Sequence, residues 1–188
     1  MTVSKNDSNT MPSITYLKPL QEERGRNEDA QRRYLARVSG TQGETPDEVL
    51  LDWFQEQPEA AENWSWLDLA TFSWTKIEIK LDELPAGEVF RGGEEQLKRL
   101  QNDVHWERQW IWKQVQEHGT WHLPPIVFET SALQDVPAWV NSPLHLAEGY
   151  HRLAAVHRAK SENLPIAAVH TFWMARSAPI ITKDSEAT

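Results

Sequence analysis

A glycine, two basic side chains and a carboxylate lie together in the segment Glu148–Arg152, which reads Glu-Gly-Tyr-His-Arg. An apolar run at Leu144–Glu148 predicts a short strand before it, and a helix is expected over His151–Ala159. A strand that passes through glycine into a helix presents free N–H groups, and the helix dipole adds partial positive charge there. With Arg152 and His151 at the same turn, the segment predicts an anion site, above all for a phosphate.

Each of these side chains also has a structural alternative. Arg152 could pair with Glu148, His151 could hold a loop carbonyl, and Glu148 could act as a cap or an ion-pair partner instead of a catalytic group. Tyr150 is interpreted as a packing residue. Arg91, which follows the first expected strand and precedes two glycines, is a further candidate for the phosphate pocket.

The chain is acidic, and this restricts its partners. It has 188 residues and a formal net charge of −9, with a pI near 5.3. Such a balance argues against nucleic-acid binding, which needs clustered basic residues. The densest group of arginines alternates with acidic residues, which is typical of a solvated helix face and not of a nucleic-acid arm. That group comprises Arg24, Arg26, Arg32, Arg33 and Arg37.

Cysteine is absent, which excludes a disulfide framework, a thiolate nucleophile and a Cys-ligated metal site. The histidines lack the spacing of a zinc site, so no metal centre is predicted. No apolar run approaches the roughly 20 residues that cross a bilayer. The N-terminus is polar and lacks the apolar core of a signal peptide. We therefore expect a cytoplasmic protein with no membrane partner.

The ten tryptophans are unusual for a chain of this length. One interpretation is that they fill the core and cover a small sheet. The alternatives are a partner interface or stacking on a base, because aromatic side chains contribute strongly to interfaces and accept the π-face of any base.

Composition along the chain predicts four regions. They are a disordered tail over residues 1–14, a helical N-terminal extension over 15–63, a main domain over 64–176 and a flexible tail over 177–188. In the extension a helix is expected over residues 28–38. A second helix is expected from Thr45-Pro-Asp-Glu48, which has the pattern of a capping box with proline at the first helical position. These helices either pack on the main domain or form a docking arm for a protein partner.

The main domain combines both types of secondary structure. Strands are expected over residues 76–81, 123–128, 144–148 and 166–172. A helical segment over 94–118 has a break near 102–105 and ends at Gly119, and the helix at 151–159 follows the candidate turn. This order predicts an α+β fold, with a small mixed β-sheet and helices packed against it.

Three segments of the main domain together resemble the ParB/sulfiredoxin-like superfamily. They are Pro124-Pro-Ile-Val-Phe128, the turn Glu148-Gly-Tyr-His-Arg152 with the Leu-Ala-Ala that follows it, and Leu164-Pro-Ile-Ala-Ala-Val169. Members of the superfamily commonly carry a strand after proline, then an acidic-Gly-x-His-Arg turn and helix, and a final strand after proline. The resemblance covers roughly residues 64–175.

The resemblance implies binding of a nucleotide (ATP, ADP or CTP) together with Mg²⁺. By position, Gly149 would allow close backbone approach, and His151 and Arg152 would contact phosphates. Glu148 would lie where a general base or a metal-directed carboxylate stands, and the loop of Arg91 would reach the pocket.

Two departures narrow the expected activity. Tyr150 stands where sulfiredoxins carry their cysteine, which excludes sulfinic-acid repair. No basic helix-turn-helix region follows the domain, which argues against chromosome partitioning. The leading hypothesis is a nucleotide-phosphate-binding protein of a stand-alone branch that hydrolyses or transfers a phosphate. A non-enzymatic interaction module is the alternative, and a nuclease or DNA-binding factor is the third hypothesis.

Overall fold

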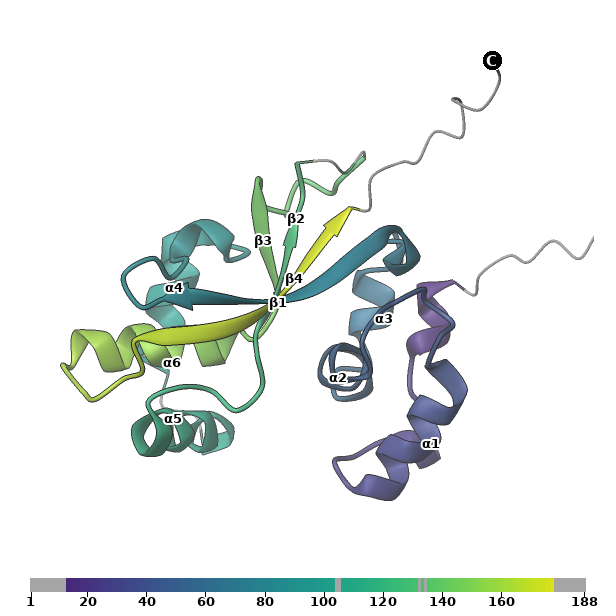
Figure 1. The fold of residues 1–188 in the computed structure, drawn as a ribbon, viewed down its shortest axis with the longest axis horizontal. Helices are drawn as coiled ribbons and strands as arrows, with labels where there is room; N and C mark the ends of the chain where they lie inside the picture. Colours follow the sequence, from purple (N-terminus) through teal and green to yellow (C-terminus); the bar gives the residue numbers. More distant parts are fainter. Residues whose placement is uncertain (1–12, 104–105, 132, 134, 178–188) are drawn as a thin grey trace, which may run out of the picture. The chain divides into compact units, whose positions relative to one another are not determined.

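The computed structural model describes residues 13–103, 106–131, 133 and 135–177. The chain forms two compact units that divide between Thr71 and Phe72, and Figure 1 shows their elements. Residues 64–71 therefore group with the N-terminal extension, whereas the sequence placed them in the main domain. Most of the expected tail over residues 1–14, and all but Ser177 of the tail over 177–188, lie outside the described residues.

The first unit is helical, as expected. Its described elements are η1 (Ile14–Leu17), η2 (Gln21–Glu23), α1 (Glu28–Val38), α2 (Asp47–Val49), the π-helix η3 (Leu50–Gln55), α3 (Ala60–Asn63) and η4 (Leu69–Thr71). Helix α1 has the predicted bounds, because the side chain of Asn27 caps it by accepting a hydrogen bond from the Ala30 N–H at 2.9 Å.

A buried ion pair holds α1 to the segment before it. The Arg37 guanidinium donates to both carboxylate oxygens of Glu23, at 2.7 and 2.6 Å. It also donates to the Tyr16 carbonyl at 2.6 Å. The Glu23 side chain is only 4% exposed. Hydrogen bonding to Arg37 lowers the pKa of Glu23, so the pair is charged and well partnered.

The capping box expected at Thr45–Glu48 is wrong. The Thr45 hydroxyl donates backward to the Gln42 carbonyl at 2.8 Å. Pro46 takes the N-cap position with extended ψ, and no side chain caps α2. After three residues the helix continues as the π-helix η3. The Thr45 side chain therefore stabilises a turn over residues 42–45 instead of capping the start of α2.

The second unit has the mixed sheet that the sequence predicts. Its described elements are β1 (Phe72–Lys80), η5 (Gly87–Val89), α4 (Gly93–Gln101), α5 (Trp106–His118), β2 (Ile126–Glu129), β3 (Leu144–Glu148), α6 (Tyr150–Ser161) and β4 (Val169–Ser177). The strand order is β1-β4-β2-β3. Strand β4 is antiparallel to β1 and parallel to β2, and β2 is antiparallel to β3. The α+β fold class is confirmed.

Tertiary pairing changes the bounds of the outer strands. Strand β1 begins at Phe72, before the expected start at residue 76, and β4 runs to Ser177, beyond the expected end at 172. The two strands pair along their whole length, from Phe72 opposite Ser177 to Lys80 opposite Val169. The expected strand over 123–128 forms only from Ile126, after its two prolines.

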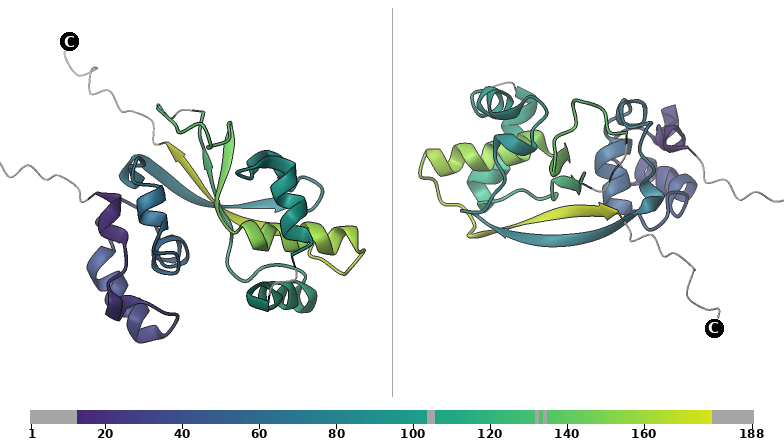
Figure 2. Two further views of the ribbon diagram at one scale, coloured as in Figure 1. Left: turned by 180° about the vertical axis from the view of Figure 1, so that it is seen from behind. Right: turned by 90° about the horizontal axis from the view of Figure 1, so that it is seen from above.

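One hydrophobic core lies between the helices and the sheet of the second unit. Figure 2 shows α4, α5 and α6 gathered on one side of the β1–β4 ribbon. Strands contribute Val127, Leu146 and Phe172 to this core, and helices contribute Leu97 and Leu153. The break between α4 and α5 and the end of α5 at Gly119 agree with the sequence prediction.

Several tryptophans are core residues. Trp53 is 1% exposed and packs edge-on against Trp64, with ring centroids 5.3 Å apart. Trp121 is 6% exposed and donates its indole N–H to the Thr171 carbonyl at 2.9 Å. Trp110, in contrast, is 41% exposed. The core-filling interpretation holds for the buried ones.

Candidate functional site

The candidate turn forms at the expected place, where β3 ends and α6 begins. Gly149 is the N-cap of α6 with a left-handed φ of 94°. Its carbonyl accepts from the Leu153 N–H at 2.9 Å, and the helix begins at Tyr150, one residue earlier than expected.

Gly149 is needed at this turn for packing as well as for its backbone angle. A Cβ at Gly149 would lie 2.6 Å from the Cβ and 2.8 Å from the Cα of Pro125. Pro125 is itself fixed, because its carbonyl accepts from the Trp173 N–H at 2.9 Å. The close approach expected at Gly149 is therefore made by the segment before β2.

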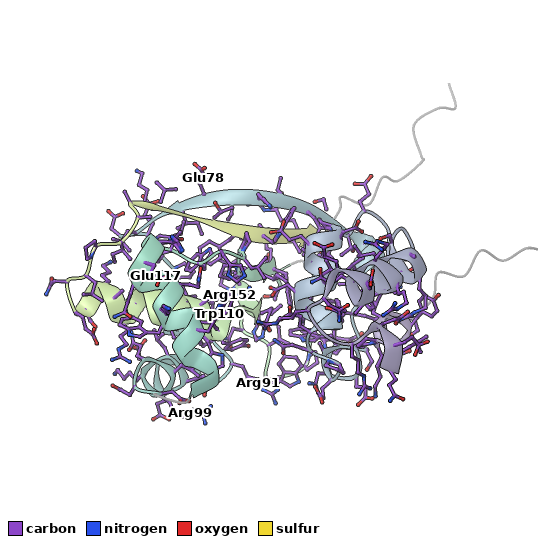
Figure 3. All side chains as sticks on the ribbon, turned by 90° about the horizontal axis from the view of Figure 1, so that it is seen from below. Glu78, Arg91, Arg99, Trp110, Glu117 and Arg152 are labelled. Atoms are coloured by element: carbon purple, nitrogen blue, oxygen red, sulfur yellow. The ribbon has the colours of Figure 1, made fainter. Side chains whose placement is uncertain are left out.

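Arg152 adopts its structural alternative. Its side chain is 6% exposed, and Nη2 lies 3.2 Å from Oε1 of Glu148, whose side chain is 16% exposed. Nη1 donates to the Leu123 carbonyl at 3.3 Å. The guanidinium thus joins the end of β3 and the first turn of α6 to the segment before β2. In Figure 3 Arg152 lies among packed side chains behind α5.

His151 faces a different direction from Arg152. It lines a small cavity of about 30 Å³ between α4, α5 and α6. Ala155 and Arg158 share this face of α6, and the Arg158 guanidinium stacks over Trp112, 4.5 Å from the ring centroid. The cavity has room for only a few water-sized molecules, so it does not admit a nucleotide as it stands.

Arg91 is exposed and lies apart from Arg152. Its guanidinium stacks over Trp139, 4.6 Å from the ring centroid, and Figure 3 shows it nearer the rim of the view. Its positive charge contributes to lowering the pKa of His145. Of the predicted set, the structure brings together Glu148, Gly149 and Arg152, whereas His151 faces the small cavity. Arg91 lies beside Tyr150, the middle residue of the turn, whose side chain hydrogen-bonds the Arg91 backbone.

A buried polar cluster next to the turn was missed by the sequence analysis. His145 is fully buried in β3, and its Nδ1 accepts from the Asn141 N–H at 2.9 Å. The neutral ring therefore carries its proton on Nε2, which lies 3.5 Å from the Tyr150 hydroxyl oxygen. Burial, with a smaller effect of Arg91, lowers the pKa of His145 to about 4.

This cluster ties the loops around the turn to one another. The Asn141 side chain donates to the carbonyls of Glu88 and Phe90, at 2.7 and 2.6 Å. The ring of Phe90 packs edge-on against Tyr150 with centroids 5.4 Å apart. Burial raises the pKa of Tyr150 to about 12, so the phenol stays protonated. The sequence did contain a signal for this cluster: His145 stands between two leucines of an expected strand, five residues before Tyr150.

Among the described residues, no group of three His, Cys, Asp or Glu side chains is placed to hold a metal ion. In the same part of the chain, none of the helices has both the length and the apolar character needed to cross a membrane.

Comparison with known proteins found no similarity: no family model, curated protein or solved structure matches the chain. The likeness to the ParB/sulfiredoxin-like superfamily therefore depends on the residue pattern of the three segments, and membership stays a prediction.

Proposed function

We propose that the second unit binds the phosphate groups of a nucleotide, with ATP, ADP and CTP as the candidates, at the turn Glu148–Arg152. One observation carries this proposal: a guanidinium that is 6% exposed lies at the start of a helix, with a carboxylate at 3.2 Å as its anionic partner. A buried cation requires an anion beside it, and the start of a helix favours one. A phosphate would supply an anion both beside the buried guanidinium and at the start of the helix, as the Glu148 carboxylate does in the structure.

Exchange of the carboxylate for a phosphate is the chemical core of the proposal. Arg152 donates from Nη2 to Oε1 of Glu148, and a guanidinium can hold a phosphate by two parallel bonds. Glu148 would turn away as the phosphate binds. Its carboxylate would then stand beside the phosphates, free to accept a proton or to approach a Mg²⁺ ion that arrives with the nucleotide.

Arg91 can join such a site at small cost. It is exposed, and leaving the ring of Trp139 costs about 0.5–1 kcal/mol for an exposed cation–π contact. His151 would contribute only after the small cavity around it opens, so binding depends first on Glu148, Gly149 and Arg152.

Isothermal titration of the full chain with ATP, ADP, CTP and GTP, with and without Mg²⁺, tests the proposal. At least one nucleotide is expected to bind. Glu148→Gln keeps an acceptor for Arg152 but removes the competing charge, so it should tighten Mg²⁺-free binding by about tenfold. Arg152→Lys should weaken binding, because it keeps the charge of the ion pair and loses the two-bond geometry.

Arg99→Gln on the exposed face of α4 is the matched control and should change nothing. The proposal fails if no nucleotide binds at millimolar concentration, or if Arg152→Lys and Arg99→Gln bind with the same affinity.

An interaction role for the first unit is less well supported. Tyr16 and Leu20 are 40% and 49% exposed, but single exposed apolar side chains are common on protein surfaces. They do not favour a docking arm over the nucleotide site.

A further inference from the structure

The open edge of the sheet is a second surface with specific chemistry. β1 stands at one end of the strand order β1-β4-β2-β3, and among the described strands only β4 pairs with it. The strand is nine residues long, which is long for an edge strand that has no second partner within the described part of the chain. Figure 2 shows β1 as the outer strand of the ribbon.

Hydrogen bonding in the sheet fixes which backbone groups face the open edge. The Leu81 N–H donates to the Ala168 carbonyl at 3.0 Å, so the backbone of Leu81 faces β4. Trp173, which lies opposite Lys76, instead donates its N–H to the Pro125 carbonyl at 2.9 Å and so faces away from β1. Because the direction of backbone groups alternates along a strand, the odd-numbered residues of β1 bond to β4. Trp74, Lys76 and Glu78 therefore point their N–H and C=O groups outward.

The side chains of the same residues share one face of the sheet. Lys76 stacks over Trp173 with its Nζ 4.8 Å from the ring centroid, and Figure 3 shows Glu78 projecting from β1 away from the helices. Ile77 packs on the opposite face, against the hydrophobic core. Lys76, Glu78 and Lys80 are all exposed. The edge thus presents alternating charge in the order Lys-Ile-Glu-Ile-Lys.

We propose that two copies of this chain pair antiparallel through β1, with Ile77 of each copy on the two-fold axis. Lys76 then lies opposite Glu78 of the second copy, and by symmetry this ion pair forms twice. Trp74 lies opposite Lys80 of the second copy, at cross-strand distance for a cation–π contact. The two sheets become one continuous sheet, and the β1 edge of each copy is covered.

Other registers are less favourable. A two-fold axis through Lys76 places Lys76 opposite Lys76 of the second copy, so that two like charges face each other. An axis through Glu78 sets Glu78 against itself and Lys76 against Lys80. An axis through Ile79 sets Glu78 opposite Lys80 of the second copy, but only residues 78–80 of each β1 then overlap, because the backbone turns after Lys80, where the Glu83 N–H donates to the Lys80 carbonyl at 2.9 Å.

Lysines on an edge strand ordinarily discourage pairing. Here Glu78 lies between two of them, so the edge repels strands of other sequence and complements itself. The surface is separate from the nucleotide turn, because β4 and β2 lie between β1 and β3 in the strand order. Dimerisation and nucleotide binding therefore stand or fall independently.

Sedimentation equilibrium of the full chain tests the pairing. The wild type is expected to be dimeric, and Lys76→Glu should raise the dissociation constant by about tenfold, because two attractive cross-strand pairs become repulsive. The double variant Lys76→Glu with Glu78→Lys restores opposite charges only in the proposed register and should recover the wild-type constant. Lys98→Glu on exposed α4 is the control and should leave the constant unchanged.

Cross-linking gives a second readout, because the chain has no cysteine of its own. Ile77→Cys would place two thiols across the axis in a non-hydrogen-bonded pair, with Cα atoms about 4.5 Å apart. Thr75→Cys is the control, with its two copies about 13 Å apart. A monomeric wild type, failure of the double variant to recover, or equal cross-linking at residues 75 and 77 would each overturn the proposal. If Ile77→Cys does not fold, the dissociation constants of Lys76→Glu and of its double variant with Glu78→Lys test the proposal without it.

Discussion

Replacing Gly149 with alanine tests why glycine stands between β3 and α6. Gly149 has a φ of 94°, and an added Cβ would meet the Cβ of Pro125 at 2.6 Å and its Cα at 2.8 Å. One of these contacts is to backbone, and Pro125 is bonded to β4 through the Trp173 N–H. The added methyl group therefore has to displace either α6 or the segment before β2.

The expected cost has two parts. A left-handed backbone costs about 1 to 2 kcal/mol for a residue with a Cβ. Overpacking by one methyl group adds about 1 to 3 kcal/mol when its neighbours cannot move. We therefore expect Gly149→Ala to lower the free energy of unfolding by about 2 to 5 kcal/mol.

Gly93→Ala is the matched control in the same unit. Gly93 also has a positive φ, of 65°, but a Cβ there would meet nothing within 4 Å. It should show the backbone cost alone, so urea unfolding followed by circular dichroism should separate the two variants by about 1 to 3 kcal/mol. Equal losses for the two variants would refute the reasoning, since Pro125 would then not restrict the turn.

Three further predictions concern buried charges and titrating groups. Glu23→Gln should destabilise the protein by about 2 kcal/mol at neutral pH, and because Arg37 lowers the folded pKa of Glu23, urea unfolding should show the difference vanish as the pH falls through that lowered pKa. The pKa of His145 is lowered from 6.5 to about 4, so the unfolded chain binds the proton more readily than the folded protein. The free energy of unfolding should therefore fall by about 3 kcal/mol as the pH decreases from 6.5 to about 4. In a series of urea titrations at different pH, His145→Gln should remove this pH dependence. Arg152→Met should cost about 3 kcal/mol by removing the cation beside the half-buried carboxylate of Glu148, and adding Glu148→Gln should recover most of that loss in the same assay. A wild-type slope retained in His145→Gln, or additive losses in the double variant, would contradict these predictions.

Elements with local signals were predictable from the sequence. Helix α1 begins after a capping asparagine and carries its own apolar stripe, and β3 is an apolar run that ends in a glycine. The break between α4 and α5 and the stop at Gly119 are also local features. In each case the cause lies within a few residues of the boundary, so one sequence contains it.

Features set by distant partners were not predictable. The bounds of β4 depend on the nine residues of β1 that pair with it. Thr45 is a local exception: it has the right type and spacing for a capping box, but its hydroxyl donates to the Gln42 carbonyl three residues earlier, and the residue types alone did not decide between the two. The direction of Arg152 depends on the carbonyl of Leu123, 29 positions away in the sequence. No local pattern reports such a partner.

The turn Glu148–Arg152 shows how one motif can serve packing and binding together. Gly149 packs on Pro125 and Arg152 pairs with Glu148, so loss of stability on substitution would not distinguish the two roles. Glu148→Gln does distinguish them, because the weaker bond from Arg152 should lower stability while loss of the competing charge should raise phosphate affinity. A purely structural pair predicts the first change without the second. Opposite signs in the same variant are therefore the signature of an anion site that Glu148 occupies until a phosphate replaces it.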